Sequence, residues 1–324
     1  MQNRTKQLAE NALLLGIAGV FLFLGLNVLP FFANIFLPIP FILLGLRRSG
    51  KEMLVISLAF ALLGMLLSNI PGIIVAIGGV LIGWSMGYAY KKTNRAFPGV
   101  FAGSIVSVLM TLVGIYITLQ IFNINPLDQI NQAFQTVMNS DQFFGMVPAG
   151  YTLEQWKESM EMLRMTLVSM LPFFLVASGF IATALIHWLA RMISKRLRVA
   201  IPAMPPIREW KIPRVLLFIY LIVMLLMFFN QSNLYEQTWG STLISVFYSL
   251  QVLFFVQGIS FISFAVHKYK NNPRFRGVMI GVFIFLLLAT ILSMGAILVI
   301  ATLVGFIGLL DIGIHLRTKL ESRK

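Results

Sequence analysis

The residues that could carry catalytic chemistry are few in this chain, and the clearest pattern is GWSMG at positions 83–87. Hydrolases use Gly-x-Ser-x-Gly at a sharp strand-to-helix turn that exposes a nucleophilic serine. Here the pattern lies inside an apolar segment, and a ladder of Gly79, Gly83 and Gly87 already explains both glycines as positions that pack against the next span, at 98–122. Ser85, His187 and Asp311 would lie near the inner ends of their segments, so a Ser-His-Asp set is the alternative interpretation. We expect packing, and no enzyme.

Asp311 is the one carboxylate within a predicted membrane-spanning segment. Acids inside a membrane are functional candidates by default. However, Arg317 follows within two turns, and His315 would lie four residues along on the same helical face. Hydration or local pairing is therefore the favoured interpretation. Because no acid, Lys or Arg falls at mid-bilayer depth in any predicted span, the pattern argues against a proton- or sodium-driven pump.

Motifs for cofactors and energy sources are missing from the sequence. There is no cysteine, which excludes disulfides and thiolate metal sites. No Walker motif, metal-binding histidine cluster or Rossmann glycine pattern occurs. We therefore expect no cofactor, no metal and no energy source within the chain itself.

Neutral polar residues remain as candidates for ligand binding. Asn27, Asn34 and Gln120 fall near the predicted outer boundary, and Phe31 is beside the first two in sequence. A few amides among aromatic side chains suit a small organic ligand in an apolar cleft. Hydrogen bonding between helices is the alternative interpretation of the same amides.

The elements that must position these residues are membrane helices. The chain is 58% hydrophobic and only 11% charged, with a mean hydropathy of +0.88, whereas soluble domains carry about 25% charged residues. A bilayer core of about 30 Å needs roughly 20 helical residues. We predict an all-α integral membrane protein with about ten spans, near 11–29, 31–46, 53–69, 72–90, 98–122, 165–190, 215–229, 242–266, 277–293 and 295–316. Segment 31–46 contains Pro38 and Pro40, so we expect it to be broken or partly re-entrant and packed inside protein.

Charge orients these spans. With both termini in the cytoplasm, 23 of the 25 Lys and Arg residues fall on inner segments, and only Lys157 and Arg164 fall outside. This distribution follows the positive-inside rule. It also explains the net charge of +14 without a nucleic acid partner.

Segment 123–164 is the one long hydrophilic stretch, and the charge pattern places it outside. It holds five of the eleven acids. Residues 127–137 predict one amphipathic helix, and a capping box at Thr152–Gln155 begins a second. Nothing breaks the helical pattern before Pro172, so we expect this second helix to run straight into the span at 165–190 and the segment to act as a lid.

A basic, proline-rich connection at 191–214 divides the chain. We predict a six-span membrane domain at 1–190, an inner linker at 191–214 and a four-span domain at 215–324.

The order of these features resembles known families. The small residues of the first span, the stretch LPFFANIFLPIPFILLGL, the turn RRSGKE, LLGMLLSN and the glycine-rich fourth span resemble the S components of energy-coupling factor (ECF) vitamin transporters over about residues 10–190. The whole chain is similar to the YybS-like family of uncharacterised bacterial membrane proteins. The S-component resemblance implies an outward-facing ligand pocket gated by residues 30–36 and 123–164. It also implies that Ala12 and Gly16 meet a transmembrane coupling protein driven by cytoplasmic ATPases. The expected location is the bacterial cytoplasmic membrane.

Two functions from different classes follow from these observations. The first is a transport-type subunit that binds a small neutral or amphipathic solute and depends on partners for energy. The second is a non-transporting scaffold or regulator whose basic inner loops dock a cytoplasmic protein or anionic lipid. An intramembrane hydrolase built on Ser85 is a distant third.

Overall fold

The computed structural model is helical wherever it describes the chain. It describes residues 2–197, 199–230, 238–269, 271–272, 277, 281 and 295–322. Within these residues there are twelve α-helices, one π-helical turn, one 3-10 turn and no strand. The all-α prediction is confirmed. The predicted span at 277–293 lies almost wholly outside the described residues.

The chain divides into two compact units. The first unit is Met1–Phe143 with Phe174–Met204, and the second is Phe144–Phe173 with Pro205–Lys324. The predicted domains at 1–190 and 215–324, joined by a linker at 191–214, remain a prediction.

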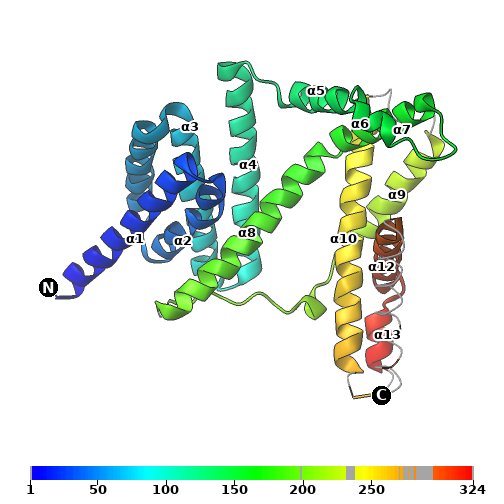
Figure 1. Ribbon diagram of the computed structural model, residues 1–324. Helices are drawn as coiled ribbons and strands as arrows, with labels where there is room; N and C mark the ends of the chain where they lie inside the picture. Colours follow the sequence, from blue (N-terminus) through cyan, green and yellow to red (C-terminus); the bar gives the residue numbers. More distant parts are fainter. Residues whose placement is uncertain are drawn as a thin grey trace. The chain divides into compact units, whose positions relative to one another are not determined.

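The first unit is built around the long segments α3 (Gly50–Thr93) and α4 (Ala96–Phe122) and the short helix α2 (Pro38–Arg47), which is buried. All three are labelled in Figure 1. Asn94 caps the C-terminal end of α3, and Asn123 caps the C-terminal end of α4. Both take the left-handed conformation, which asparagine adopts more readily than most residues. Its elements are α1 (Gln2–Asn27), the π-turn η1 (Phe32–Phe36), α2 (Pro38–Arg47), α3 (Gly50–Thr93), α4 (Ala96–Phe122), α5 (Pro126–Met138), the start of α6 (Asp141–Gly145) and most of α8 (Leu171–Arg196).

Helix α3 is a hairpin of two helical arms. Its 44 residues include non-helical dihedral angles at Ser68 (φ −157°, ψ 36°) and Asn69 (φ 48°, ψ −135°). The chain turns back at this point, as the α3 ribbon in Figure 1 shows, and the backbones of Gly64 and Gly72 come into contact. The two arms correspond to the predicted spans at 53–69 and 72–90.

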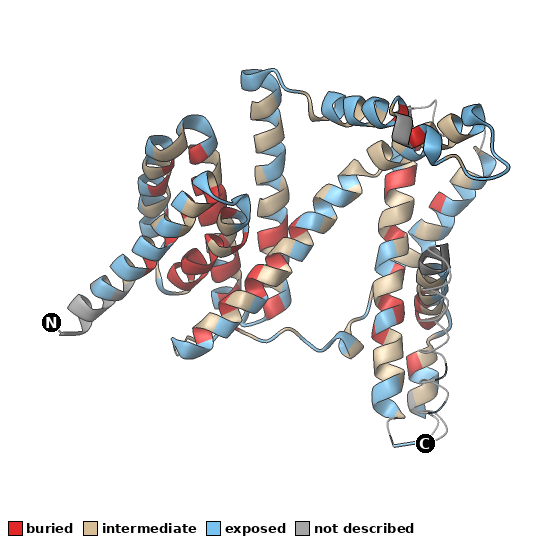
Figure 2. Ribbon diagram, viewed as in Figure 1, coloured by how far each residue is buried: buried red, intermediate tan, exposed pale blue. Residues whose placement is uncertain are grey.

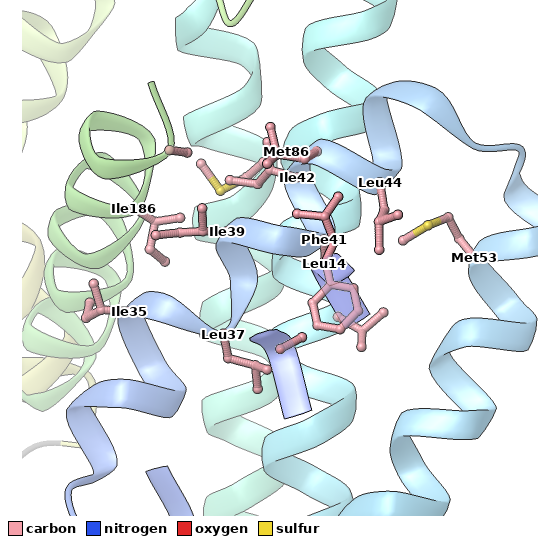
Figure 3. Packing of buried hydrophobic residues seen from close by; sticks show 14 of the residues in the cluster. Leu14, Ile35, Leu37, Ile39, Phe41, Ile42, Leu44, Met53, Met86 and Ile186 are labelled. Atoms are coloured by element: carbon pink, nitrogen blue, oxygen red, sulfur yellow. The ribbon is translucent and has the colours of Figure 1, made fainter. Parts of the chain in front are cut away.

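Helix α2 is the core of the first unit. Eight of its ten residues, Pro38–Gly45, are buried. Figure 3 shows Ile42 of α2 beside Met86 of α3, Ile39 of α2 beside Ile186 of α8, and Leu44 of α2 opposite Met53 of α3. Buried residues gather in the same region in Figure 2. The expectation that segment 31–46 packs inside protein is confirmed for residues 37–45. At 1.5 Å per residue its sixteen residues span about 24 Å, less than a full bilayer core.

The glycine ladder of α3 faces α2. A Cβ atom on Gly79 would overlap Leu37, one on Gly83 would overlap the Pro38 carbonyl, and one on Gly87 would overlap the Ile42 carbonyl. The ladder thus lies against α2, whereas the span at 98–122 was its expected partner.

The contact between α3 and α4 uses other small residues. Gly99 of α4 faces Tyr90, and Gly103 of α4 faces Met86. Small residues permit such close approach in lipid, where van der Waals packing holds helices together. Both sides of the second α3 arm are therefore packed closely.

Helix α7 (Leu153–Ser169) begins as predicted and ends earlier than predicted. The Thr152 hydroxyl accepts from the Gln155 N–H, and the Gln155 side chain accepts from the Thr152 N–H, so the capping box is confirmed. The helix stops at Ser169, and α8 begins at Leu171. Pro172 explains the break because its nitrogen cannot donate to the preceding turn and its ring clashes with that turn. The expected run of this helix into the span at 165–190 is therefore confirmed only as far as Ser169, where a one-residue break separates α7 from α8.

The second unit is built on the pairing of α10 (Thr238–Lys268) with α12 (Gly295–Ile314), which run side by side in Figure 1. Gly258 contacts the Val304 backbone, and Gly308 contacts the Phe254 carbonyl. Tyr220 packs its ring against Phe254 at a centroid distance of 5.1 Å. The other elements are α7, the 3-10 turn η2 (Ile207–Glu209), α9 (Val215–Phe229) and α13 (Leu316–Ser322).

Several helices have the length and composition of membrane spans. Among the described residues, four helical segments qualify: Gly50–Thr93, Ala96–Phe122, Leu171–Arg196 and Trp239–Lys268. Shorter apolar helices cover Asn11–Asn27, Phe32–Arg47, Val215–Phe229 and Val299–Ile314. The chain is thus a multi-pass helical membrane protein, and the number of ten crossings with both ends inside stays a prediction.

Candidate functional site

An ion pair is enclosed within the second unit. Nε of Arg317 donates to Oδ2 of Asp311 over 2.9 Å, and the two side chains are 6% and 3% exposed. Removing two charges from water costs free energy. The attraction between the charges offsets this cost only where the pair is well aligned and its remaining polar atoms are hydrogen-bonded. The surroundings of this pair meet that condition.

The pair forms because the chain changes direction between its two members. Helix α12 ends at Ile314, His315 takes a left-handed conformation with φ 54°, and α13 begins at Leu316. In an uninterrupted helix, six residues turn through roughly 600°, which would place Asp311 and Arg317 on different faces. The left-handed residue returns Arg317 to Asp311 instead. Hydration of Asp311 is excluded as its main environment, and local pairing is confirmed with Arg317 rather than His315.

Helix α10 supplies two further partners. Nε2 of Gln257 donates to Oδ2 of Asp311 over 2.6 Å. Nη2 of Arg317 donates to the Ser260 hydroxyl oxygen over 2.9 Å. Gln257 and Ser260 are three residues apart, so they share one face of α10, and both are buried.

The segment before α9 is tied to the same network. Nη1 of Arg317 donates to the Arg208 carbonyl over 2.8 Å. The Ser260 hydroxyl lies 2.5 Å from the Ile207 carbonyl oxygen, to which it donates. The Ile212 N–H donates to Oε1 of Gln257 over 3.1 Å. The end of the predicted linker is therefore fixed on α10, and Arg317 joins three separate pieces of chain.

A cavity of about 140 Å³ opens beside this network. Lys211 and Arg214 line it together with Asp311, His315 and Arg317. Nη2 of Arg214 lies 2.8 Å from Nδ1 of His315. A guanidinium can only donate, so this ring nitrogen is the acceptor.

The chemistry that this arrangement supports is binding. The cavity carries three cationic side chains and one carboxylate, and that carboxylate is already engaged by Arg317 and Gln257. Within the described residues, no group of three or more His, Asp or Glu side chains is arranged to hold a metal ion. The site therefore offers hydrogen-bond donors and positive charge to a ligand.

The comparison with known families matches nearly the whole chain. Residues 13–312 match the family described as predicted membrane protein (DUF2232). The chain belongs to this family. It is similar to "Uncharacterized protein YybS" of Bacillus subtilis (strain 168), with 27% identity over 327 residues, covering 98% of this chain and 99% of that protein. No solved structure matches. The predicted resemblance to the YybS-like family is confirmed at this level, and the S-component resemblance stays a prediction.

The first unit of this DUF2232 protein holds two buried polar pairs. The Tyr90 hydroxyl lies 2.7 Å from Nδ1 of His187, and the Ser104 hydroxyl lies 2.8 Å from that of Thr183. The first pair joins α3 to α8, and the second joins α4 to α8. Such pairs fix the register of neighbouring helices because a buried polar atom without a partner is costly.

The three members of the alternative Ser-His-Asp set have different partners. The Ser85 hydroxyl donates to the Ile82 carbonyl of its own helix over 2.9 Å. His187 is paired with Tyr90, and Asp311 is paired with Arg317. Ser85 and His187 belong to the first unit, whereas Asp311 belongs to the second.

The predicted ligand residues lie at the surface of the first unit. Asn27, Phe31 and Asn34 are exposed along the end of α1 and the start of η1, and Nδ2 of Asn27 donates to the Phe23 carbonyl. Gln120 is exposed on a different element, in the last turn of α4. The first three are therefore near one another in the chain, and the role of all four in ligand binding stays a prediction.

The predicted small-residue positions differ in environment. Ala12 and Gly16 are exposed on α1, and a Cβ atom on Gly16 would meet nothing within 4 Å. Gly79, Gly83 and Gly87 are buried. The face of α1 that carries Ala12 and Gly16 is therefore open, whereas α2 fills the space beside the three glycines of α3.

Sequence reasoning missed most of the site in the second unit. It identified Asp311 and did not connect it with Gln257. The usable signal was the pair Gln257 and Ser260, whose spacing puts two polar side chains on one face of an apolar helix. The partnership with Arg317 depends on a left-handed histidine, for which the sequence holds no distinctive pattern.

Proposed function

We propose that this DUF2232 protein is a transport-type solute-binding subunit of the bacterial cytoplasmic membrane that depends on another protein for energy. One observation carries the proposal. Helix α1 buries one stripe, with Leu14, Ala18 and Leu22 in the core, while Ala12 and Gly16 stand open on a different side. Small residues on an open helix face suit close packing with another membrane helix. The S-component resemblance assigns the same two residues to a coupling protein.

The binding of a solute in this proposal rests on three residues between positions 27 and 34. Asn27, Phe31 and Asn34 are exposed and come from consecutive elements, and their amides and aromatic ring suit a small neutral or amphipathic molecule. Gln120 would join them if the outer ends of α1 and α4 face one cleft.

Affinity purification in mild detergent tests the partner. The wild-type protein should retain a membrane coupling protein with its ATPases, and Gly16→Leu should lose them because the added side chain fills the approach. Gly114→Leu is the matched control, since a Cβ atom on Gly114 of α4 would also meet nothing within 4 Å. A wild-type protein that retains no such partner would refute the proposal.

Mass spectrometry of the purified protein tests the solute. A small molecule should be retained by the wild type, and retention should fall in Asn34→Ala and Gln120→Ala. Thr111→Ala is the control, because its hydroxyl donates to the Ser107 carbonyl in the middle of exposed α4. Equal retention in all three variants would remove these residues from the binding site.

A scaffold or regulator is the second candidate, and a cluster of cations favours it. Lys91, Lys92, Arg95, Lys195 and Arg196 are all exposed. The pairs that join α3 and α4 to α8 bring the three helix ends that carry these residues to the same end of the first unit. A photocrosslinker at Lys195 that captures a signalling enzyme, with no ATPase in the purification, would favour this candidate over transport.

A further inference from the structure

The cavity of the second unit is formed where three helices and the segment before α9 meet. Lys211 and Arg214 come from that segment, Gln257 from α10, Asp311 from α12, and Arg317 from α13. Lys211 and Arg214 are exposed, whereas Asp311 and Arg317 are buried. The cavity thus has a fixed inner wall and a charged rim that solvent can reach.

The charge of this cavity is positive. Arg317 neutralises Asp311 through direct contact, which leaves Lys211 and Arg214 uncompensated within the lining. Asp311 is the only acid among the lining residues that the structure describes. A cationic ligand would therefore meet repulsion at the rim, and an anion would meet two cations and the remaining N–H groups of Arg317.

The size of the cavity limits the ligand. Its volume is about 140 Å³, well below the roughly 300–1,000 Å³ of pockets that hold drug-sized molecules. It suits a compact group and is too small to enclose a solute the size of a vitamin. Among compact anions, phosphate matches a cavity with two guanidinium groups, because arginine binds it through paired hydrogen bonds.

We propose that this cavity binds a phosphate group through Lys211 and Arg214, with Arg317 held behind them by Asp311. The network prepares the site in advance. Arg317 is fixed by three hydrogen bonds, and the backbone at Ile212, between the two rim cations, is fixed by Gln257. Little ordering is then needed when the anion arrives.

The phosphate group could belong to either of two sources. The charge rule places segments 191–214 and 317–324 at the inner membrane surface, where anionic phospholipid headgroups attract basic residues. Free phosphate in the cytoplasm presents the same oxygens. This site is separate from the solute and partner faces of the first unit, so the proposal goes beyond the proposed function and can stand or fall without it.

Two measurements on the full-length protein test the proposal and distinguish the sources. For free phosphate, thermal unfolding in neutral detergent is followed with sodium phosphate and with sodium chloride at equal ionic strength and pH. For lipid, the protein is reconstituted in nanodiscs containing phosphatidylglycerol and phosphatidylcholine, and native mass spectrometry after release counts the retained phosphatidylglycerol.

The decisive variant is the double substitution Lys211→Gln/Arg214→Gln. This variant should bind the phosphate-bearing ligand more weakly, with an apparent affinity lower by on the order of tenfold or more. Arg47→Gln/Lys51→Gln removes the same charge from exposed positions of the first unit that belong to neither the cavity nor the cation cluster, and it should leave the response unchanged. Lys211→Arg/Arg214→Lys keeps the charge and should retain binding, so it separates loss of charge from faulty folding.

Each outcome supports or overturns the proposal. Free phosphate is supported if sodium phosphate raises the unfolding midpoint of the wild type and of the control, and this rise is lost only in the Lys211→Gln/Arg214→Gln variant. Selective loss of retained phosphatidylglycerol in that variant supports the lipid. A wild-type protein that responds to neither probe overturns the proposal. So does an equal loss in the Arg47/Lys51 control, because that result would show a response to total charge rather than to this cavity.

Discussion

Arg317 reaches Asp311 because His315, which lies between them, takes a left-handed conformation. The resulting contact of 2.9 Å is buried, and the same guanidinium donates to Ser260 of α10 and to the Arg208 carbonyl. One side chain thus joins α10, α13 and the segment before α9 to α12. Loss of this pair should therefore disturb several elements of the second unit at once.

Asp311→Asn should destabilise the protein strongly. The substitution leaves the buried Arg317 charge without its counter-charge, and breaking such pairs costs roughly 3–5 kcal/mol. The free energy of unfolding in mixed detergent micelles measures the effect. Glu209→Gln is the control, because the Arg208–Glu209 pair is 3.9 Å long with side chains 38% and 58% exposed, and surface pairs contribute about 0–1 kcal/mol. Similar losses in the two variants would show that the Asp311 pair is not structural.

Tyr90→Phe should cost roughly 1–3 kcal/mol, because it leaves Nδ1 of buried His187 without the hydroxyl that lies 2.7 Å away. The control is Tyr220→Phe, because the ring of Tyr220 packs against Phe254 and Phe247. This substitution should change the free energy of unfolding by no more than about 0.5 kcal/mol. The unfolding free energies of the two variants provide the comparison. Equal values would mean that the Tyr90 hydroxyl does not hold α3 to α8.

Gly83→Ala should destabilise the first unit by about 1–3 kcal/mol, the usual cost of overpacking. The new methyl group would overlap the Pro38 carbonyl and approach Phe41 of α2. Gly114→Ala, which has free space, should be neutral or stabilising because alanine favours the helix by about 1 kcal/mol. Thermal unfolding of both variants tests the difference, and a neutral Gly83→Ala would contradict the close approach of α2 and α3.

The features that sequence could predict are those with a local cause. The capping box at Thr152 needs only residues three apart, and the break between the α3 arms lies at the boundary of the predicted spans at 53–69 and 72–90. Both were found in place. The apolar runs likewise predicted most helices, since periodicity and length depend on adjacent residues.

The features that escaped prediction depend on distant partners or on backbone conformations that residue type does not specify. The glycine ladder of α3 indicates a close contact without identifying its partner, which is α2. The end of α7 at Ser169 depends on how the turn before Pro172 resolves a clash. Arg317 meets Asp311 through a left-handed histidine, a conformation for which glycine or asparagine is the usual signal. The candidate site in the second unit therefore emerges only from three-dimensional placement.

Thr152→Ala should loosen the start of α7. The substitution removes the acceptor of the Gln155 N–H, and losing such a cap costs roughly 0.5–2 kcal/mol. Hydrogen exchange at residues 153–156 should accelerate accordingly. Thr136→Ala provides the comparison, because its hydroxyl only donates to the Gln132 carbonyl within α5, and exchange at 153–156 should be unchanged in it. Unaltered exchange in Thr152→Ala would show that other contacts hold this end of α7.

The orientation of the chain can be tested with single cysteines, because the natural sequence has none. The split of 23 basic residues inside against two outside predicts that α5 faces the exterior and that the junction between α3 and α4 faces the cytoplasm. Gln132→Cys and Lys92→Cys occupy exposed positions in these two places. In intact cells, a membrane-impermeant maleimide should label Gln132→Cys alone, and permeabilisation should expose Lys92→Cys to the same reagent. The cysteine-free parent controls for background. Labelling of Lys92→Cys in intact cells would reverse the orientation and would move both the basic cavity and the cation cluster to the outer surface, where a cytoplasmic partner could reach neither.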